Sequence, residues 1–275
     1  MMILNCRNKK LELGKRTIIM GILNITPDSF SDGGKYYQTD LAFEHARKLI
    51  ADGADILDIG GESTRPGYIQ ISDEEEIERV VSIIEKISKE LDTIISIDTY
   101  KYKVAENAID AGAHIVNDIW GLQYDDGQMA DLVGACNVPL IAMHNQNNKE
   151  YNEDIISAIR KFFEKTYLIA FEHNIPKENI ILDPGIGFGK DINLNIEVLK
   201  RLSEIRDMGR ILLGTSKKRF IGTILGDVST DDRIEGTIAS SVIGVMNGVD
   251  IIRVHNVLEN KRAIMVADEI IRGNK

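Results

Sequence analysis

Polar residues and glycines stand at the ends of short apolar runs in this 275-residue chain. Asp98, Asn117 and Asp183 each close such a run, while Lys218 and Arg253 accompany two later ones. Buried carboxylates and amides need partners, and this set has donors and acceptors suited to a flat nitrogen heterocycle. The two cations are suited to an anion. These residue types therefore predict a pocket for a heterocycle that carries a phosphate-type leaving group.

Two further features bear on the anion. His255 follows Arg253 closely and could share the anion with it, and glycine-rich segments after the strands allow main-chain N–H groups to approach phosphate. The G-x-G-x-G spacing of residues 185–189 is not a dinucleotide-binding fingerprint. The sequence also has no P-loop, HExxH, GxSxG or CxxC motif, so the common hydrolase, nucleotidase and zinc chemistries are not indicated.

The elements that position these residues alternate regularly. Eight β-branched or apolar runs predict strands at residues 17–23, 56–59, 93–97, 115–116, 139–143, 179–182, 210–213 and 250–254. Amphipathic helices are predicted between them at 40–52, 73–91, 101–111, 153–173, 193–205 and 232–247. Continuous apolar strands favour a parallel sheet covered by helices. We therefore expect an α/β fold, an eight-stranded β/α (TIM) barrel with its site at the strand ends, with a doubly wound open sheet as the alternative.

No repeat, low-complexity tract or Pro/Ser-rich linker divides the chain, so we expect one domain over residues 1–275. Residues 1–16 precede the first expected strand as an N-terminal extension that has the pattern of a small hairpin. The acidic run at 73–76 follows Ser72, which is suited to cap a helix, and is interpreted as a solvated helix start.

The composition excludes several function classes. The formal net charge is -10, which opposes binding to nucleic acid or to an anionic membrane surface. The sequence has no apolar run long enough to span a bilayer and no secretion signal, so a cytoplasmic protein is expected. Cys6 and Cys136 lie far apart without metal-site or redox spacing, and no role is assigned to them.

Read in order, the strand-end segments resemble those of the dihydropteroate synthases, a family of pterin-binding barrels. The matching strings are MGILNITPDSFSDGG, DIGGESTRPG, ISIDT, VNDIWG, AMH, LDPGIGFGK, LLGTSKKRFIG and IIRVHN. They extend from the first expected strand to the last. The resemblance implies condensation of 6-hydroxymethyl-7,8-dihydropterin pyrophosphate with 4-aminobenzoate, assisted by Mg2+, by an SN1-like substitution that needs no strong general base.

The resemblance also implies roles for individual residues. The pterin pocket would be formed by Asp98, Asn117, Asp183 and Lys218, with Met143 and Phe188 as apolar walls and Arg253 stacking on the ring. The catalytic groups would be Asp98, Asp183, Lys218 and Arg253. Arg253 and His255 would also contact the pyrophosphate, and Asn24 would contact the metal. The aminobenzoate side would be formed by Ser216 and by two mobile loops that contain Phe30, Ser31 and Asp32, and Thr64, Arg65 and Pro66. Members of the family are usually homodimers through their outer helices, so a homodimer is expected.

Three positions depart from the family pattern, namely Lys217 in place of arginine, Asn256 in place of aspartate, and the string NQNN after His144. Two alternatives stay open at this point. One is a methyltetrahydrofolate–corrinoid methyltransferase-like protein, which would share the acidic floor of the pocket, and the other is a catalytically silent homologue.

Overall fold

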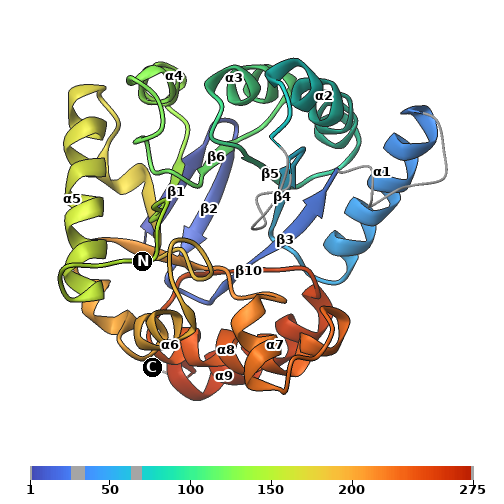
Figure 1. Ribbon diagram of the computed structural model, residues 1–275. Coiled ribbons are helices and arrows are strands. Elements are labelled where there is room, and N and C mark those ends of the chain that lie inside the picture. Colours follow the sequence, from blue (N-terminus) through green and yellow to red (C-terminus); the bar gives the residue numbers. More distant parts are fainter. Residues whose placement is uncertain (1, 26–34, 63–69, 274–275) are drawn as a thin grey trace.

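A computed structural model describes residues 2–25, 35–62 and 70–273 of the chain. Its centre is a closed barrel of eight parallel strands, in the order β10-β3-β4-β5-β6-β7-β8-β9 (Figure 1). The strands are β3 (Ile18–Asn24), β4 (Ile56–Gly60), β5 (Ile94–Asp98), β6 (Ile115–Asp118), β7 (Leu140–Met143), β8 (Ile180–Asp183), β9 (Arg210–Leu213) and β10 (Ile251–Val254). The predicted barrel is therefore confirmed.

Helices surround the barrel, and short 3-10 turns lie between some of them (Figure 1). The helices are α1 (Lys35–Ala51), α2 (Asp73–Glu90), α3 (Tyr102–Ala111), α4 (Gln128–Cys136), α5 (Ile155–Glu172), α6 (Ile192–Lys200), α7 (Arg219–Ile224), α8 (Ile234–Met246) and α9 (Val257–Arg272). The 3-10 turns are η2 (Lys177–Asn179), η3 (Leu202–Ile205) and η4 (Asp231–Arg233). Among the described residues, none of the helices combines the length and the apolarity needed to cross a membrane.

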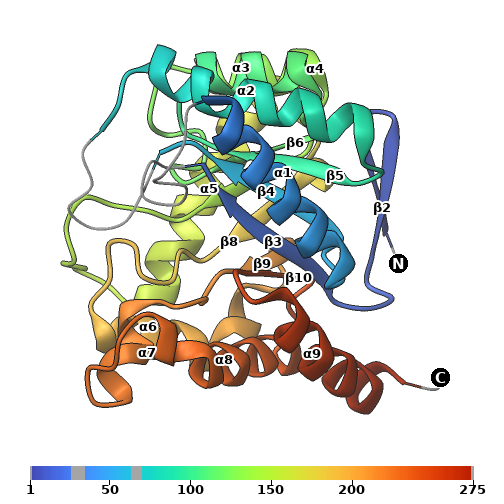
Figure 2. The ribbon, with the colours of Figure 1, turned by 90° about the vertical axis from the view of Figure 1, so that its right-hand side faces the viewer.

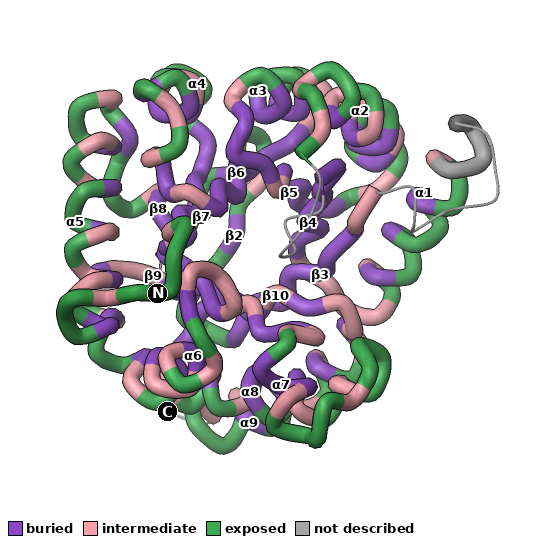
Figure 3. Tube along the Cα trace, in the orientation of Figure 1, coloured by how far each residue is buried: buried purple, intermediate pink, exposed green. Residues whose placement is uncertain are grey.

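Each strand divides its side chains between two environments, because successive residues of a strand point to opposite faces. Ile19 and Leu57 belong to the large apolar cluster that includes residues of the surrounding helices. Met20 and Ile56 belong to a second cluster, to which every strand of the barrel contributes. Figure 3 shows the buried strands in the centre of the molecule, surrounded by partly exposed helices.

The N-terminal extension forms the expected hairpin, with β1 (Met2–Cys6) antiparallel to β2 (Lys9–Leu13). Its inward side chains, Leu4, Cys6, Leu11 and Leu13, pack with the second cluster. Figure 2 shows the hairpin at the end of the barrel where the strands begin. It therefore closes that end and leaves the opposite end for the site.

Candidate active site

The polar residues predicted from the sequence do meet at the carboxyl ends of the strands. Asp98 is paired with Asn117 in the β5–β6 register, and Met143 is paired with Asp183 in the β7–β8 register. These residues line one cleft. Its full lining is Asp98, Asn117, Ile119, Met143, Asp183, Ile186, Phe188, Gly214, Lys218 and Arg253. The cleft thus has polar groups on its floor and apolar side chains on its walls.

Arg253 lies across the floor of the cleft between two carboxylates. Its Nε donates to Oδ2 of Asp58 at 2.5 Å, and its Nη2 donates to Oδ2 of Asp98. Asn117 Nδ2 donates to the same Asp58 oxygen at 3.1 Å. The guanidinium, two carboxylates and amide form one network, which holds the floor residues in fixed orientations.

Asp58 is a floor residue that the sequence analysis did not single out. It stands in the middle of β4, where the predicted strand was treated simply as an apolar run, and its side chain is 0% exposed. The available signal was the charge itself, since an ionisable residue inside a buried strand is costly unless it is paired. Its partner Arg253 is distant in sequence, so the pairing was not visible.

Two carboxylate oxygens in this network have no protein partner among the described residues, namely Oδ1 of Asp58 and Oδ1 of Asp98. Burial raises the pKa of Asp98 to about 7, and neighbouring Asp58 adds to the rise while Arg253 opposes it. Buried acceptors of this kind are costly when unpaired. They identify the floor of the cleft as a place where a ligand with N–H groups would be stabilised.

Asp183 and Lys218 occupy the other side of the cleft. Asp183 Oδ1 accepts a hydrogen bond from the main-chain N–H of Gly185 at 2.8 Å, and burial raises the pKa of its carboxyl group. Lys218 Nζ lies 4.1 Å from the centroid of the Phe188 ring, a cation–π distance. The lysine and the phenyl ring therefore form one wall together.

Lys190 is the second residue that the sequence analysis did not single out. Its buried Nζ donates to the main-chain carbonyls of Gly185 and Phe188, both at 3.0 Å, and lies 2.8 Å from His144 Nδ1. Burial lowers the pKa of Lys190 to about 7. The three contacts hold the turn that presents Phe188, and they place His144 behind that turn, outside the lining of the cleft.

Three predicted residues, Ser216, His255 and Asn24, do not line the cleft. Ser216 Oγ is 3.0 Å from His255 Nδ1 and accepts from the His255 main-chain N–H at 3.1 Å. Asn24 ends β3 opposite Gly60 of β4. Ser216 also lies before the N-terminus of α7, which begins at Arg219.

Six predicted residues lie outside the described part of the chain: Phe30, Ser31, Asp32, Thr64, Arg65 and Pro66. Their expected contribution to aminobenzoate binding stays a prediction.

Comparison with known proteins gives consistent matches. The family model described as "Pterin binding enzyme" matches residues 20–255. A dihydropteroate synthase of Clostridium beijerinckii is 51% identical over 270 residues, which cover 96% of this chain and 98% of that protein. The structure of a dihydropteroate synthase from Clostridium difficile, determined in the presence of pteroic acid, has a TM-score of 0.93 and 50% identity, and covers 95% of this chain and 99% of that one. That of Xanthomonas albilineans with 4-aminobenzoic acid has a TM-score of 0.92 and 34% identity, over 98% and 97% of the two chains.

Proposed function

This chain belongs to the dihydropteroate synthase family of pterin-binding enzymes and is a transferase, and from this premise we propose how its residues perform the reaction. The reaction joins 6-hydroxymethyl-7,8-dihydropterin pyrophosphate to 4-aminobenzoate and releases 7,8-dihydropteroate and pyrophosphate. The observation that carries the proposal is the convergence of Asp98, Asn117 and Asp183 in one cleft with Lys218 and Arg253. The close similarity over nearly the whole chain favours this activity over a corrinoid methyltransferase or a silent homologue.

The pterin ring binds between the floor and the walls of the cleft. The carboxylate of Asp183 accepts from the N–H and NH2 edge of the ring, and Asn117 and Asp98 pair with the remaining polar edge. Met143 and Phe188 provide apolar contact with the ring faces. Arg253 remains bonded to Asp58 and Asp98, so its planar guanidinium is already oriented before the substrate arrives.

The leaving pyrophosphate faces the cationic side of the site. Arg253 and His255 contact it, and Ser216 fixes the His255 ring through their mutual hydrogen bonds. The C–O bond between the pterin methylene carbon and pyrophosphate breaks, the electron-rich ring stabilises the resulting cation, and the aminobenzoate nitrogen then forms the C–N bond and loses a proton. Because the carbon is already cationic, no strong general base is needed, and this is an SN1-like substitution.

Mg2+ suits the donor set of this site. Among the described residues, no three His, Cys, Asp or Glu side chains gather as a metal cage. Mg2+ often binds through one or two protein oxygens together with waters and substrate phosphates, and the amide oxygen of Asn24 would be such a ligand. When bound there, the ion would neutralise charge on the leaving pyrophosphate.

The decisive experiment measures pyrophosphate release by the purified protein with the two substrates and Mg2+. Release should require both substrates, and mass spectrometry should identify 7,8-dihydropteroate as the other product. Release that is independent of 4-aminobenzoate would indicate a pyrophosphohydrolase and would contradict the proposal.

We further propose that two copies associate through α8 and α9, which pack side by side (Figure 1). Both helices expose large apolar side chains: Ile243, Met246, Met265, Val266, Ile270 and Ile271. Exposed apolar groups at this density are typical of an interface between subunits. Light scattering should give the mass of a dimer, and Met246→Asp combined with Ile270→Asp should give that of a monomer. A parent protein that is monomeric at micromolar concentration would refute the association.

A further inference from the structure

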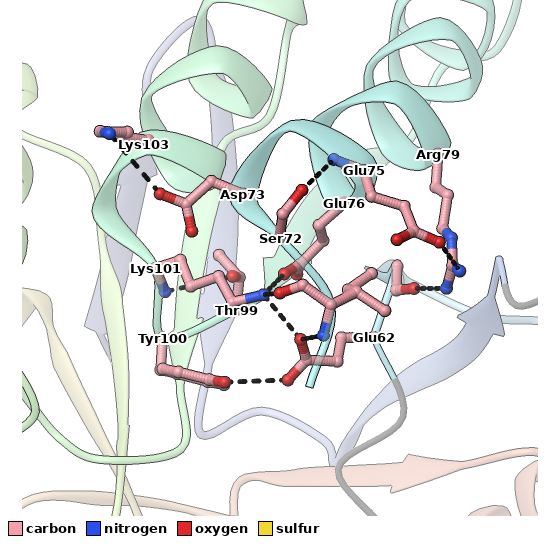
Figure 4. Close-up of polar contacts among 12 residues, drawn as sticks. Glu62, Ser72, Asp73, Glu75, Glu76, Arg79, Thr99, Tyr100, Lys101 and Lys103 are labelled. Carbon is pink, nitrogen blue, oxygen red and sulfur yellow. Dashed lines mark hydrogen bonds and ion pairs between the residues drawn. The ribbon is translucent and has the colours of Figure 1, made fainter. Parts of the chain in front are cut away.

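Among the residues that the structure describes, two lysines are buried, Lys101 and Lys190. Lys101 has two carboxylate partners, because its Nζ lies 2.6 Å from Oε2 of Glu62 and 2.9 Å from Oε2 of Glu76 (Figure 4). Burial lowers the pKa of Lys101, but the contacts with the two glutamates outweigh this effect and raise it above its ordinary value. The burial of Lys101 is therefore explained by an ion cluster.

The same cluster corrects one expectation from the sequence. Ser72 does cap α2, because its Oγ accepts from the main-chain N–H of Glu75 at 3.2 Å. However, Glu76 is not part of a solvated helix start, since its side chain is 1% exposed and faces Lys101. Burial raises the pKa of Glu76, and Lys101 opposes the rise.

Lys190 is bonded in a different way. Its Nζ donates to the main-chain carbonyls of Gly185 and Phe188 and lies 2.8 Å from His144 Nδ1, and none of these partners is a carboxylate. Burial lowers the pKa of His144 well below its ordinary value, so its ring is neutral and has one nitrogen that accepts. The three N–H groups of the lysine ammonium therefore meet three acceptors.

This arrangement does not depend on the charge of Lys190. Burial lowers its pKa to about 7, but a neutral amine still donates to two carbonyls and can accept from His144 in the other ring tautomer. Stability is a poor reason for placing a lysine here, because a buried ammonium without a carboxylate partner carries a desolvation penalty that an apolar side chain avoids. The contacts of Lys190 instead fix the geometry of the main chain that it binds.

The main chain in question is the glycine-rich turn at residues 185–189. Gly185 and Gly187 have φ values of 68° and 86°, and glycine is the residue that adopts many other conformations most readily. Lys190 holds two carbonyls of this turn, and the buried Asn195 accepts from the main-chain N–H of Gly187 at 2.7 Å. Side-chain contacts therefore supply the rigidity that the glycines lack.

The turn forms a wall of the pterin cleft. Ile186 and Phe188 line the cleft, and the Phe188 ring lies 4.1 Å from Nζ of Lys218. A Cβ atom placed on Gly187 would lie 3.1 Å from Cδ of Lys218, so the turn also packs against the stem of that lysine. A shift of the turn would consequently move an apolar wall and a cation of the site together.

We propose that Lys190 is a positioning residue, which holds the turn at 185–189 so that Phe188 and Lys218 are in place before the pterin binds, with His144 as the group that orients the lysine. The inference rests on the proposed function, in which the pterin ring occupies this cleft. It assigns no contact with either substrate to Lys190 or His144 themselves.

The test uses Lys190→Met, which keeps the approximate length of the side chain and removes its N–H groups. The Kd for 6-hydroxymethylpterin, measured by calorimetry, should rise at least about tenfold, because binding must then order the turn. The KM for the pterin pyrophosphate should rise with it. The kcat at saturating substrates should stay within about threefold of the parent value, because the bound pterin restores the turn.

Two variants of His144 separate positioning from packing, since its ring also packs against Phe162 with the ring centroids 5.0 Å apart. His144→Phe keeps a ring and removes the polar contact with Lys190, and it should raise the same Kd. His144→Asn loses the ring but has an amide that can accept or donate, and it should keep the Kd closer to the parent value than His144→Phe does. A packing role for His144 predicts the reverse order.

Leu4→Ala is the control for stability, because Leu4 is buried under the hairpin at the opposite end of the barrel. It should lower the melting temperature and leave the Kd for 6-hydroxymethylpterin unchanged. An unchanged Kd in Lys190→Met would overturn the inference, as would a Kd that rises in Leu4→Ala as much as in Lys190→Met.

If Lys190→Met does not fold, the His144 pair decides, and an equal or larger rise of the Kd in His144→Asn than in His144→Phe would overturn the inference. A parent protein that binds 6-hydroxymethylpterin but makes no dihydropteroate would refute the proposed reaction and leave these binding measurements valid. A parent protein that does not bind the pterin would refute both proposals.

Discussion

Asp183 is the residue whose charge we expect to matter most for pterin binding. One of its oxygens is held by Gly185, and the carboxylate lines the cleft. Asp183→Asn should nearly abolish binding of 6-hydroxymethylpterin, because charge-assisted hydrogen bonds of roughly 1.5–3 kcal/mol each are lost. Calorimetry measures the effect. Asp191→Asn, at an exposed helix cap, should bind normally. If the Kd of Asp183→Asn for 6-hydroxymethylpterin stays within about threefold of the parent value, Asp183 does not bind the pterin.

Asp98 should make stability depend on pH. Burial raises its pKa from 3.8 to about 7, so the folded protein holds this proton more tightly than the unfolded chain does. The stabilisation associated with the proton is fully present below about pH 4 and is lost as the pH rises through about 7. In urea titrations across this range, Asp98→Asn should show a flatter dependence of unfolding free energy on pH than the parent. Parallel curves for the two proteins would contradict the shift.

The sequence was informative where a polar residue closes an apolar strand. Asp98, Asn117 and Asp183 were predicted on that basis, and the structure brings them into one cleft. Asp58 and Lys190 were missed for a physical reason: their roles depend on partners that only the closed barrel and the folded turn supply. The spacing of residues along the chain does not contain those contacts.

At the scale of elements, the turn between β9 and α7 separates two adjacent lysines. Lys217 adopts a left-handed conformation with φ of 57°, and its Nζ lies 3.0 Å from Asp231, away from the cleft lining. Lys218 lines the cleft. Lysine in place of the family's arginine at position 217 is therefore tolerated, because the Lys217 side chain pairs with Asp231 at the surface.

This turn gives a paired prediction. Lys217→Arg should change kcat/KM by only a few-fold, whereas Lys218→Ala should lower it on the order of 100-fold, because a charge-assisted bond of about 2–3 kcal/mol is lost in a desolvated pocket. Steady-state kinetics on both variants measures the contrast. A large loss at 217 with a small one at 218 would show that the pocket lysine has been assigned to the wrong position.

Strands were easier to predict than helices. All eight barrel strands lie within a few residues of the apolar runs, because strands buried on both faces produce continuous apolar sequence. The prediction did not include α4, α7 or α9. Of these, α7 has only 6 residues, too few to establish a helical period. The 16-residue α9 was long enough and has an amphipathic pattern, so the sequence contained a signal for it that was missed.

At the scale of the whole molecule, the N-terminal hairpin should contribute strongly to stability. Leu4 is 1% exposed against the barrel end, whereas its neighbour Ile3 is 49% exposed. Leu4→Ala should lower the free energy of unfolding by about 2–5 kcal/mol, the range for a buried leucine that leaves a cavity. Urea denaturation of this variant and of the matched Ile3→Ala control measures the difference. Similar midpoints for the two would mean that the hairpin does not close the barrel in solution.

The same hairpin imposes an order on the making of the protein. It precedes every barrel strand in the chain, yet its apolar face packs on residues as late as Ile251 of β10. During translation the ribosome therefore releases Leu4, Leu11 and Leu13 long before their last partner has been synthesised. A nascent chain that stops short of β10 therefore lacks part of the apolar surface on which these leucines pack. Burial of the apolar face of the hairpin is thus complete only after the last barrel strand has been synthesised.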